Sequence, residues 1–103
     1  MLDKLNSVEA NYEELSALLA TPSVQSDSNE YRKHAKALAE IQPLVEKYRE
    51  YKVVLKEIED NQELAKGDDA DMRELAKEEL KSLDARRDAL FAEMKILLIP
   101  KDQ

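Results

Sequence analysis

Apolar residues recur at alternating spacings of three and four along nearly the whole chain, and this periodicity limits the possible folds more than any other feature. The first predicted helix spans about residues 2–20, and its apolar stripe, which starts one residue earlier, consists of Met1, Leu5, Val8, Tyr12, Leu15 and Leu19. The 103 residues include only one Gly and three Pro, so few positions interrupt a helix. The sequence therefore predicts an all-α fold of long helices.

The second predicted helix spans residues 28–65, after a polar connection that begins at Pro22. Asp27 is a favoured N-cap type, and Glu30 stands three residues later at the capping-box distance. Pro43 lacks a backbone donor, so we expect a kink there, with a complete break into two helices as the lesser alternative. The expected inner stripe is Tyr31, Leu38, Ile41, Val45, Tyr48, Leu55 and Ile58, flanked by Leu44, Tyr51 and Val54.

The third predicted helix spans residues 72–98 and ends before Pro100. Gly67, the single glycine, is expected to form a left-handed C-cap of the preceding helix. Asp71 and Glu74 repeat the capping-box spacing at the start of the third helix. Its apolar stripe consists of Ala76, Leu80, Leu83, Leu90, Met94 and Leu97, with Arg87 at one position of the seam.

Helix lengths and short connections predict the architecture. At 1.5 Å per residue the three helices are roughly 28, 55 and 40 Å long, and short connections make neighbours antiparallel. We therefore expect an antiparallel three-helix bundle, with a projecting two-helix coiled hairpin and a long second helix kinked near Pro43. Residues 1–98 are expected to form the helical domain, and residues 99–103 the start of a linker to absent downstream domains.

Composition excludes several kinds of site. The chain has no Cys, and its net charge of −7 disfavours unaided binding to nucleic acid or to an anionic membrane. The longest apolar run, residues 96–99, is far shorter than the roughly 18 residues of a membrane span. His34 is expected to contact Glu30 one helical turn earlier rather than to act as a general base. We expect no catalytic residue and no cofactor.

The aspartates near the turn and two basic stretches each allow a second interpretation. The residues 68–71 resemble part of a calcium loop, but they lack its Gly and its bidentate Glu, so helix capping is expected instead of a metal site. Arg86, Arg87 and the residues 47–52 could contact RNA within a larger assembly. Acidic residues alternate with these cations, which is typical of an ordinary solvated helix face.

Two short motifs are more specific than a general helical pattern. The segment Asp-Ala-Asp-Met-Arg-Glu-Leu-Ala-Lys-Glu-Glu-Leu at residues 69–80 resembles the pattern D-x-E-M-R-E-M-A-x-E-E-L of the bacterial release factor 1 family. Residues 97–102, Leu-Leu-Ile-Pro-Lys-Asp, resemble the L-L-L-P-K-D that closes the family's first domain. Residues 12–15 and 18–19 are also similar to the family's first helix, whereas Gln103 stands where the family often has proline.

The resemblance implies that this is the N-terminal domain of a class I translation termination factor in the cytoplasm. The complete factor of the family reads stop codons and promotes peptidyl-tRNA hydrolysis through a Gly-Gly-Gln motif. Neither that motif nor a P-x-T codon-reading tripeptide occurs in this chain, so the domain itself is expected not to be an enzyme. The alternative is an acidic coiled-coil adaptor or a chaperone-like interaction module of another family.

The resemblance also implies partners for this domain. They are the GTPase-associated region and stalk base of the large ribosomal subunit, with functional interplay with the GTPase class II release factor. No membrane and no autonomous nucleic-acid binding are expected. Charged residues near the predicted turn are the candidate contacts, and we expect them to lie on a tip with little apolar area: Lys66, Asp68, Asp69, Asp71 and Arg73.

Overall fold

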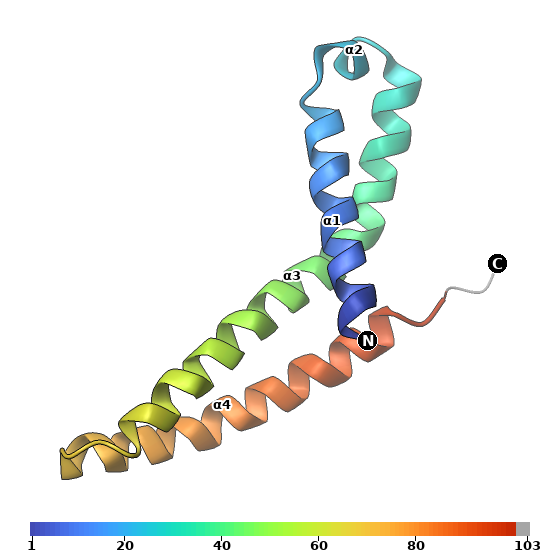
Figure 1. Ribbon diagram of the computed structural model, residues 1–103. Helices are drawn as coiled ribbons and strands as arrows, with labels where there is room; N and C mark the ends of the chain where they lie inside the picture. The colour runs from blue at the N-terminus through green and yellow to red at the C-terminus, as the bar shows by residue number, and fades with distance from the viewer. Residues whose placement is uncertain (101–103) are drawn as a thin grey trace. The chain divides into compact units, whose positions relative to one another are not determined.

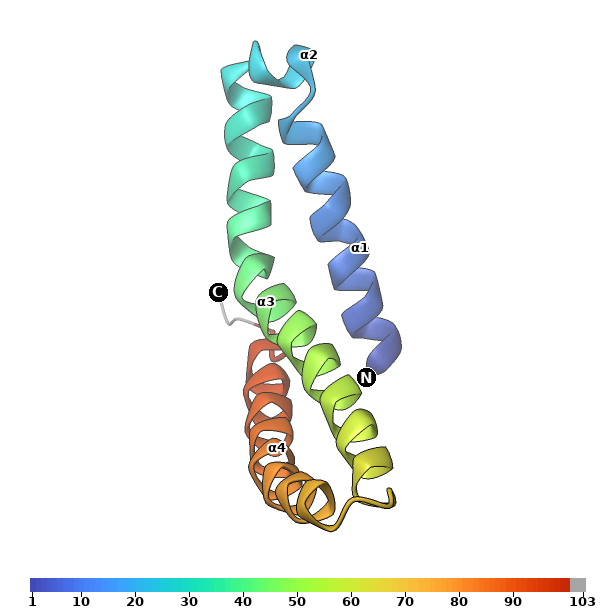
Figure 2. The same cartoon turned by 90° about the vertical axis from the view of Figure 1, so that its left-hand side faces the viewer.

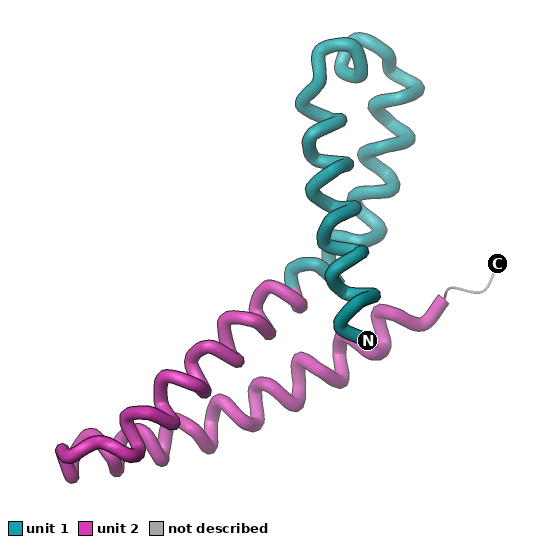
Figure 3. Tube along the Cα trace, viewed as in Figure 1, with its two compact units in different colours: residues 1–46 teal, residues 47–103 magenta. Residues whose placement is uncertain are grey.

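The computed structural model describes residues 1–100, and this part of the chain is an all-α helical bundle without strands (Figure 1). The helices are α1 (Leu2–Leu19), α2 (Pro22–Gln25), α3 (Ser28–Leu64) and α4 (Ala70–Leu97). The predicted fold class is therefore confirmed. The chain divides into two compact units, unit 1 (residues 1–46) and unit 2 (residues 47–103), and α3 contributes to both (Figure 3). The last three residues of the predicted linker lie outside the described residues.

Unit 1 is an antiparallel pair of helices. α1 lies beside the N-terminal part of α3, as Figures 1 and 2 both show. Leu5 and Leu15 on α1 are buried, and so are Leu44 and Val45 on α3. These positions belong to or flank the predicted apolar stripes, and burial of the stripes stabilises the pair through the hydrophobic effect.

The connection between α1 and α3 contains a short helix that the sequence analysis did not predict. Thr21 adopts an extended conformation at the N-cap of α2, and Pro22 occupies the first helical position, where its missing N–H costs nothing. Gln25 Nε2 donates a hydrogen bond to the carbonyl of Leu19 at 3.1 Å. α2 therefore satisfies one of the free carbonyls at the end of α1.

Asp27 caps α3 as predicted, but the reciprocal part of the capping box is absent. Its Oδ1 accepts hydrogen bonds from the backbone N–H groups of Asn29 and Glu30 at 3.1 and 3.2 Å. The backbone N–H of Asp27 instead bonds to the carbonyl of Val24 at 3.0 Å. The Glu30 side chain is therefore not required at the cap, and its Oε2 lies 3.3 Å from Nε2 of His34, as expected for that histidine.

Pro43 lies inside α3, which continues through it from Ser28 to Leu64. The alternative of a complete break into two helices is therefore wrong. Proline leaves the carbonyl four residues earlier without its helical donor, which weakens the helix at this point without ending it. The bend expected near Pro43 stays a prediction.

Unit 2 is the predicted antiparallel hairpin, formed by the C-terminal part of α3 and by α4 (Figures 1 and 2). Val54 and Ile58 of α3 form one buried cluster with Leu83 and Leu90 of α4. Tyr51 and Leu80 pack against this cluster from the two helices. The hydrophobic effect thus holds the hairpin along its length, and Ala76 extends the buried strip toward the turn.

The predicted stripe of α3 is wrong at one position in unit 2, Leu55, whereas Tyr48 and Ile58 are buried as expected. Val54, which was placed on the flank, is 5% exposed, whereas Leu55, which was placed in the stripe, is 39% exposed. The helix buries Tyr48, Val54 and Ile58, with Tyr51 partly buried, so its spacing after Tyr48 is three, three and four. The predicted stripe positions Met1, Tyr31 and Leu97 are also exposed, because each lies near the end of a helix.

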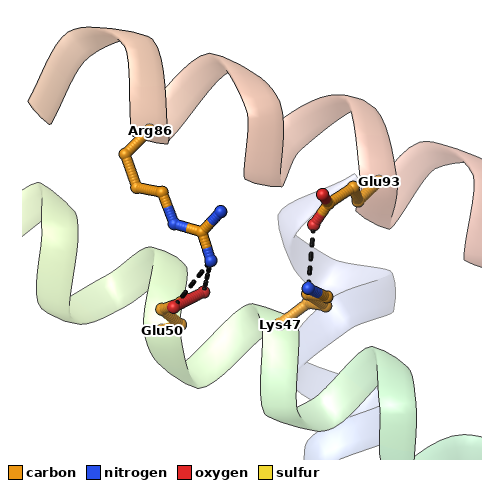
Figure 4. Close-up of polar contacts among 4 residues, drawn as sticks. All are labelled: Lys47, Glu50, Arg86 and Glu93. Carbon is orange, nitrogen blue, oxygen red and sulfur yellow. Dashed lines mark hydrogen bonds and ion pairs between the residues drawn. The ribbon is translucent and has the colours of Figure 1, made fainter. Parts of the chain in front are cut away.

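Two ion pairs join α3 and α4 on the surface of the hairpin (Figure 4). Arg86 of α4 donates hydrogen bonds to Glu50 of α3, with Nη2 2.7 Å from Oε1. Lys47 Nζ of α3 lies 3.0 Å from Oε2 of Glu93 on α4. The hydrogen bond from Arg86 lowers the pKa of Glu50, and the same bond raises the pKa of Arg86. Glu50 therefore remains charged at neutral pH.

Candidate interaction surface at the hairpin turn

The turn between α3 and α4, together with the first residues of α4, carries the five residues proposed as contacts. α3 ends in a tightened turn, in which the N–H groups of Lys66 and Gly67 bond to the carbonyls of Glu63 and Leu64 at 3.1 and 3.2 Å. The prediction of a left-handed Gly67 is wrong, because no glycine among residues 1–100 has a positive φ. These short-range bonds satisfy the terminal carbonyls that a left-handed cap would otherwise serve.

Asp69, rather than Asp71, caps the fourth helix. Its Oδ1 accepts hydrogen bonds from the backbone N–H groups of Asp71 and Met72 at 2.9 and 3.1 Å. α4 consequently begins at Ala70, two residues before the predicted start, and the predicted capping box of Asp71 and Glu74 is wrong. Asp71 lies within the first turn, where its charge still favours the helix dipole.

The candidate contacts divide into residues that shape the turn and residues that face solvent. Arg73 Nη1 donates a hydrogen bond to the carbonyl of Gly67 at 2.9 Å, and Asp69 is committed to its cap. Lys66, Asp68 and Asp71 are exposed, and Lys66 forms only a long ion pair of 3.9 Å with Glu63. These three side chains are therefore the ones available to a partner.

The hairpin tip, which we define as residues 59–79, combines acidic charge with exposed apolar side chains. It holds nine acidic and three basic residues, which gives a formal charge of −6 out of the chain's −7. The expectation of little apolar area is wrong, because Leu64, Met72 and Leu75 are 43%, 41% and 64% exposed. The tip thus offers apolar contact area surrounded by carboxylates, a combination that suits protein recognition.

Residues 1–100 show neither a metal-binding cluster nor a membrane-spanning helix. Within that range no group of three or more acidic or histidine side chains could hold a metal ion, which includes the aspartates near the turn. None of the four helices is long and apolar enough to cross a membrane.

The basic stretches considered for RNA contact are largely occupied within unit 2. Arg86 and Lys47 form the cross-helix ion pairs, and Arg87 lies 3.3 Å from Asp84. Lys52 Nζ lies 4.6 Å from the centre of the Tyr48 ring, in a cation–π contact. These contacts favour the interpretation of an ordinary solvated helix face over an RNA-binding one.

The chain matches the PCRF domain over residues 8–103. It therefore belongs to the PCRF domain family. Over all 103 residues it is 48% identical to peptide chain release factor 1 of Carboxydothermus hydrogenoformans. It is 45% identical to the release factor 1 of Bacillus anthracis and 43% identical to that of Clostridium tetani. Each match covers 99% of this chain and 29% of the relative. No solved structure matches the chain.

The matches confirm the resemblance to the first domain of bacterial release factor 1 that the two short motifs indicated. They do not favour the alternative of an acidic adaptor or a chaperone-like module from another family. The chain spans less than a third of the length of these curated relatives.

Proposed function

We propose that this chain is a non-catalytic, ribosome-contacting domain of a class I translation termination factor that acts in the cytoplasm. The observation that carries the proposal is the identity of 43–48% to peptide chain release factor 1 along the whole chain. Because the chain contains a single Gly, it cannot contain a Gly-Gly-Gln motif. The complete factor directs stop-codon-dependent release of the nascent peptide, and this domain positions the factor on the ribosome.

The hairpin tip is the surface that we assign to this positioning. Lys66, Asp68 and Asp71 face solvent beside exposed Leu75, while Asp69 holds the start of α4 in place. The partner is the stalk base and GTPase-associated region of the large subunit, and the contact also supports the interplay with the GTPase class II release factor. A small contact surface such as the hairpin tip binds weakly alone. In the complete factor, the remaining domains raise the effective concentration of the tip at its partner.

A peptide-release assay on stop-programmed ribosomes tests the proposal. It compares the complete factor, the complete factor without residues 1–98, and the chain of residues 1–103 alone. We expect the deletion to weaken ribosome binding or turnover while the hydrolytic step remains possible. The chain alone is expected to release no peptide at any concentration, and release by it would refute the non-catalytic assignment.

A tip variant of the complete factor separates the contact from a general effect of deletion. Leu75→Ser combined with Asp71→Ala alters exposed side chains of the tip, and neither belongs to the buried cluster. The matched variant, Val53→Ser combined with Asp84→Ala, also changes exposed residues of the same hairpin, but away from the turn. We expect only the tip variant to weaken ribosome binding, and equal binding by both would exclude the tip as the contact.

A further inference from the structure

Unit 1 carries a group of cations that no described acidic side chain neutralises. Arg32, Lys33 and Lys36 are exposed residues in the N-terminal part of α3. None of them forms an ion pair, a side-chain hydrogen bond or a ring contact within residues 1–100. Among the other cations of that range, only Lys4 and Lys77 share this property, and these two are isolated from each other in sequence. The unpaired positive charge of the described chain is therefore concentrated at one place.

Helical periodicity puts the three cations on one face of α3. With 3.6 residues per turn, Lys36 lies one turn beyond both Arg32 and Lys33 and between them around the helix axis. Ile41 and Val45, which are partly or fully buried in unit 1, lie on the opposite side of the helix. We call the surface formed by Arg32, Lys33 and Lys36 the basic face.

The acidic residues nearest to the basic face do not cancel its charge. Asp27 accepts two backbone hydrogen bonds at the N-cap of α3, and Glu30 lies 3.3 Å from His34. Glu40 is one turn beyond Lys36, yet the two form no ion pair. The basic face thus presents three free charges to solvent, although the chain as a whole carries −7.

The basic face does not serve the stability of its own helix. The N-terminal end of a helix carries partial positive charge, which disfavours nearby cations. Arg32, Lys33 and Lys36 lie beyond the first turn of α3, where this effect has largely fallen off, and no described side chain of unit 1 pairs with them. Exposed cations without an internal partner remain available to an external anion.

We propose that the basic face binds the phosphate backbone of structured RNA. Charges spaced along one helix face match successive phosphates, and Arg and Lys are the side chains that contact them most. Tyr31, the aromatic residue next to Arg32, is exposed but lies outside the arc of the helix that carries the three cations, so no ring is interleaved with them for stacking of single-stranded bases. The proposed ribosomal setting, on which this inference rests, supplies such RNA, and the contact is separate from the hairpin tip.

Nuclear magnetic resonance with free RNA tests the proposal at residue level. The probe is a short A-form RNA duplex, added at low salt to the isotope-labelled chain of residues 1–103, with amide shifts followed for each residue. We expect the largest shifts in residues 29–40. Because three phosphates are contacted, raising the salt from about 50 to 200 mM should lower the affinity about 20- to 40-fold.

Two variants with the same net charge provide the comparison. Arg32→Gln, Lys33→Gln and Lys36→Gln together should abolish the shifts and leave the melting temperature unchanged or higher. The matched control, Lys56→Gln, Lys77→Gln and Lys81→Gln, removes three exposed cations of unit 2 and should keep the shifts. Equal loss in both variants would overturn the proposal, because it would reduce binding to overall charge.

Other results would also overturn the assignment. Shifts centred on residues 59–79, or no shifts at all, would exclude the basic face as an RNA contact. A polyglutamate peptide that shifted the same amides as strongly as the duplex would assign the face to an acidic protein instead. A lower melting temperature of the glutamine variant would show that the three cations stabilise α3. Since no ribosome is present, these results are independent of the release assay above.

Discussion

Two neighbouring valines of α3 give the sharpest test of how the hairpin packs. Val54 is 5% exposed and belongs to the buried cluster, whereas Val53 is 57% exposed. The substitutions Val53→Ala and Val54→Ala remove the same atoms from the same helix, one residue apart. They also produce the same gain in helix propensity, about 0.5 kcal/mol, so the difference between them isolates burial.

The structure sets the size of that difference. Removing two methyl groups from a buried site costs about 1.6 kcal/mol of transfer free energy, and the cavity left among Ile58, Leu83 and Leu90 adds to this cost. We expect Val54→Ala to destabilise the chain by about 1–2 kcal/mol after the propensity gain. Val53→Ala should be neutral or stabilise it by up to about 0.5 kcal/mol.

Urea titration followed by far-ultraviolet circular dichroism measures both free energies of unfolding. The slopes of the two transitions should match that of the parent chain, because neither change alters the surface exposed on unfolding by much. Equal destabilisation by the two variants would refute the packing described for unit 2. A larger loss for Val53→Ala would mean that α3 presents a different face to α4.

Three further predictions concern the turn and the ion pairs. Asp69→Ala should cost about 0.5–2 kcal/mol through loss of the cap, whereas Asp71→Ala should cost less; thermal melts of the two compare them. Gly67→Ala should raise stability by about 0.4–1 kcal/mol in the same melts, because φ is not positive and the new Cβ would meet its nearest carbonyl oxygen at 3.4 Å. Arg86 lowers the pKa of Glu50 below its ordinary 4.5, so this pair stabilises the fold above about pH 4.5 and ceases to do so as the pH falls through the folded-state pKa. The stability difference between the parent and Glu50→Gln should therefore shrink on acidification, and a constant difference in urea titrations across acidic pH would contradict the assignment.

The sequence was sufficient for the three long helices because their determinants are local. The three long helices begin and end within two residues of their predicted bounds, since Asp27, Gly67 and Pro22 mark the interruptions. The choice between Val54 and Leu55 was not local. Both positions fit a spacing of three or four, and only the partner helix decides which one is covered.

The candidate surface was predictable in place but not in the roles of its residues. Spacing located the charged turn, yet Asp69 and Asp71 are equally good cap types, and the backbone geometry of the turn selects between them. The basic face was missed because Arg32, Lys33 and Lys36 resemble an ordinary solvated run in sequence. Ion pairing distinguishes them from Arg86 and Lys47, and pairing across helices cannot be read from one stretch of sequence.

The two ion pairs of Figure 4 also determine how far α4 can slide along α3. On α4, Arg86 and Glu93 are one heptad apart and carry opposite charges. Their partners on α3, Glu50 and Lys47, also carry opposite charges. Sliding α4 by one heptad in one direction would bring Glu93 beside Glu50, and sliding it in the other would bring Arg86 beside Lys47. Each of these shifts would keep apolar residues facing the partner helix but would place like charges side by side. The two ion pairs therefore favour the observed register of α3 and α4.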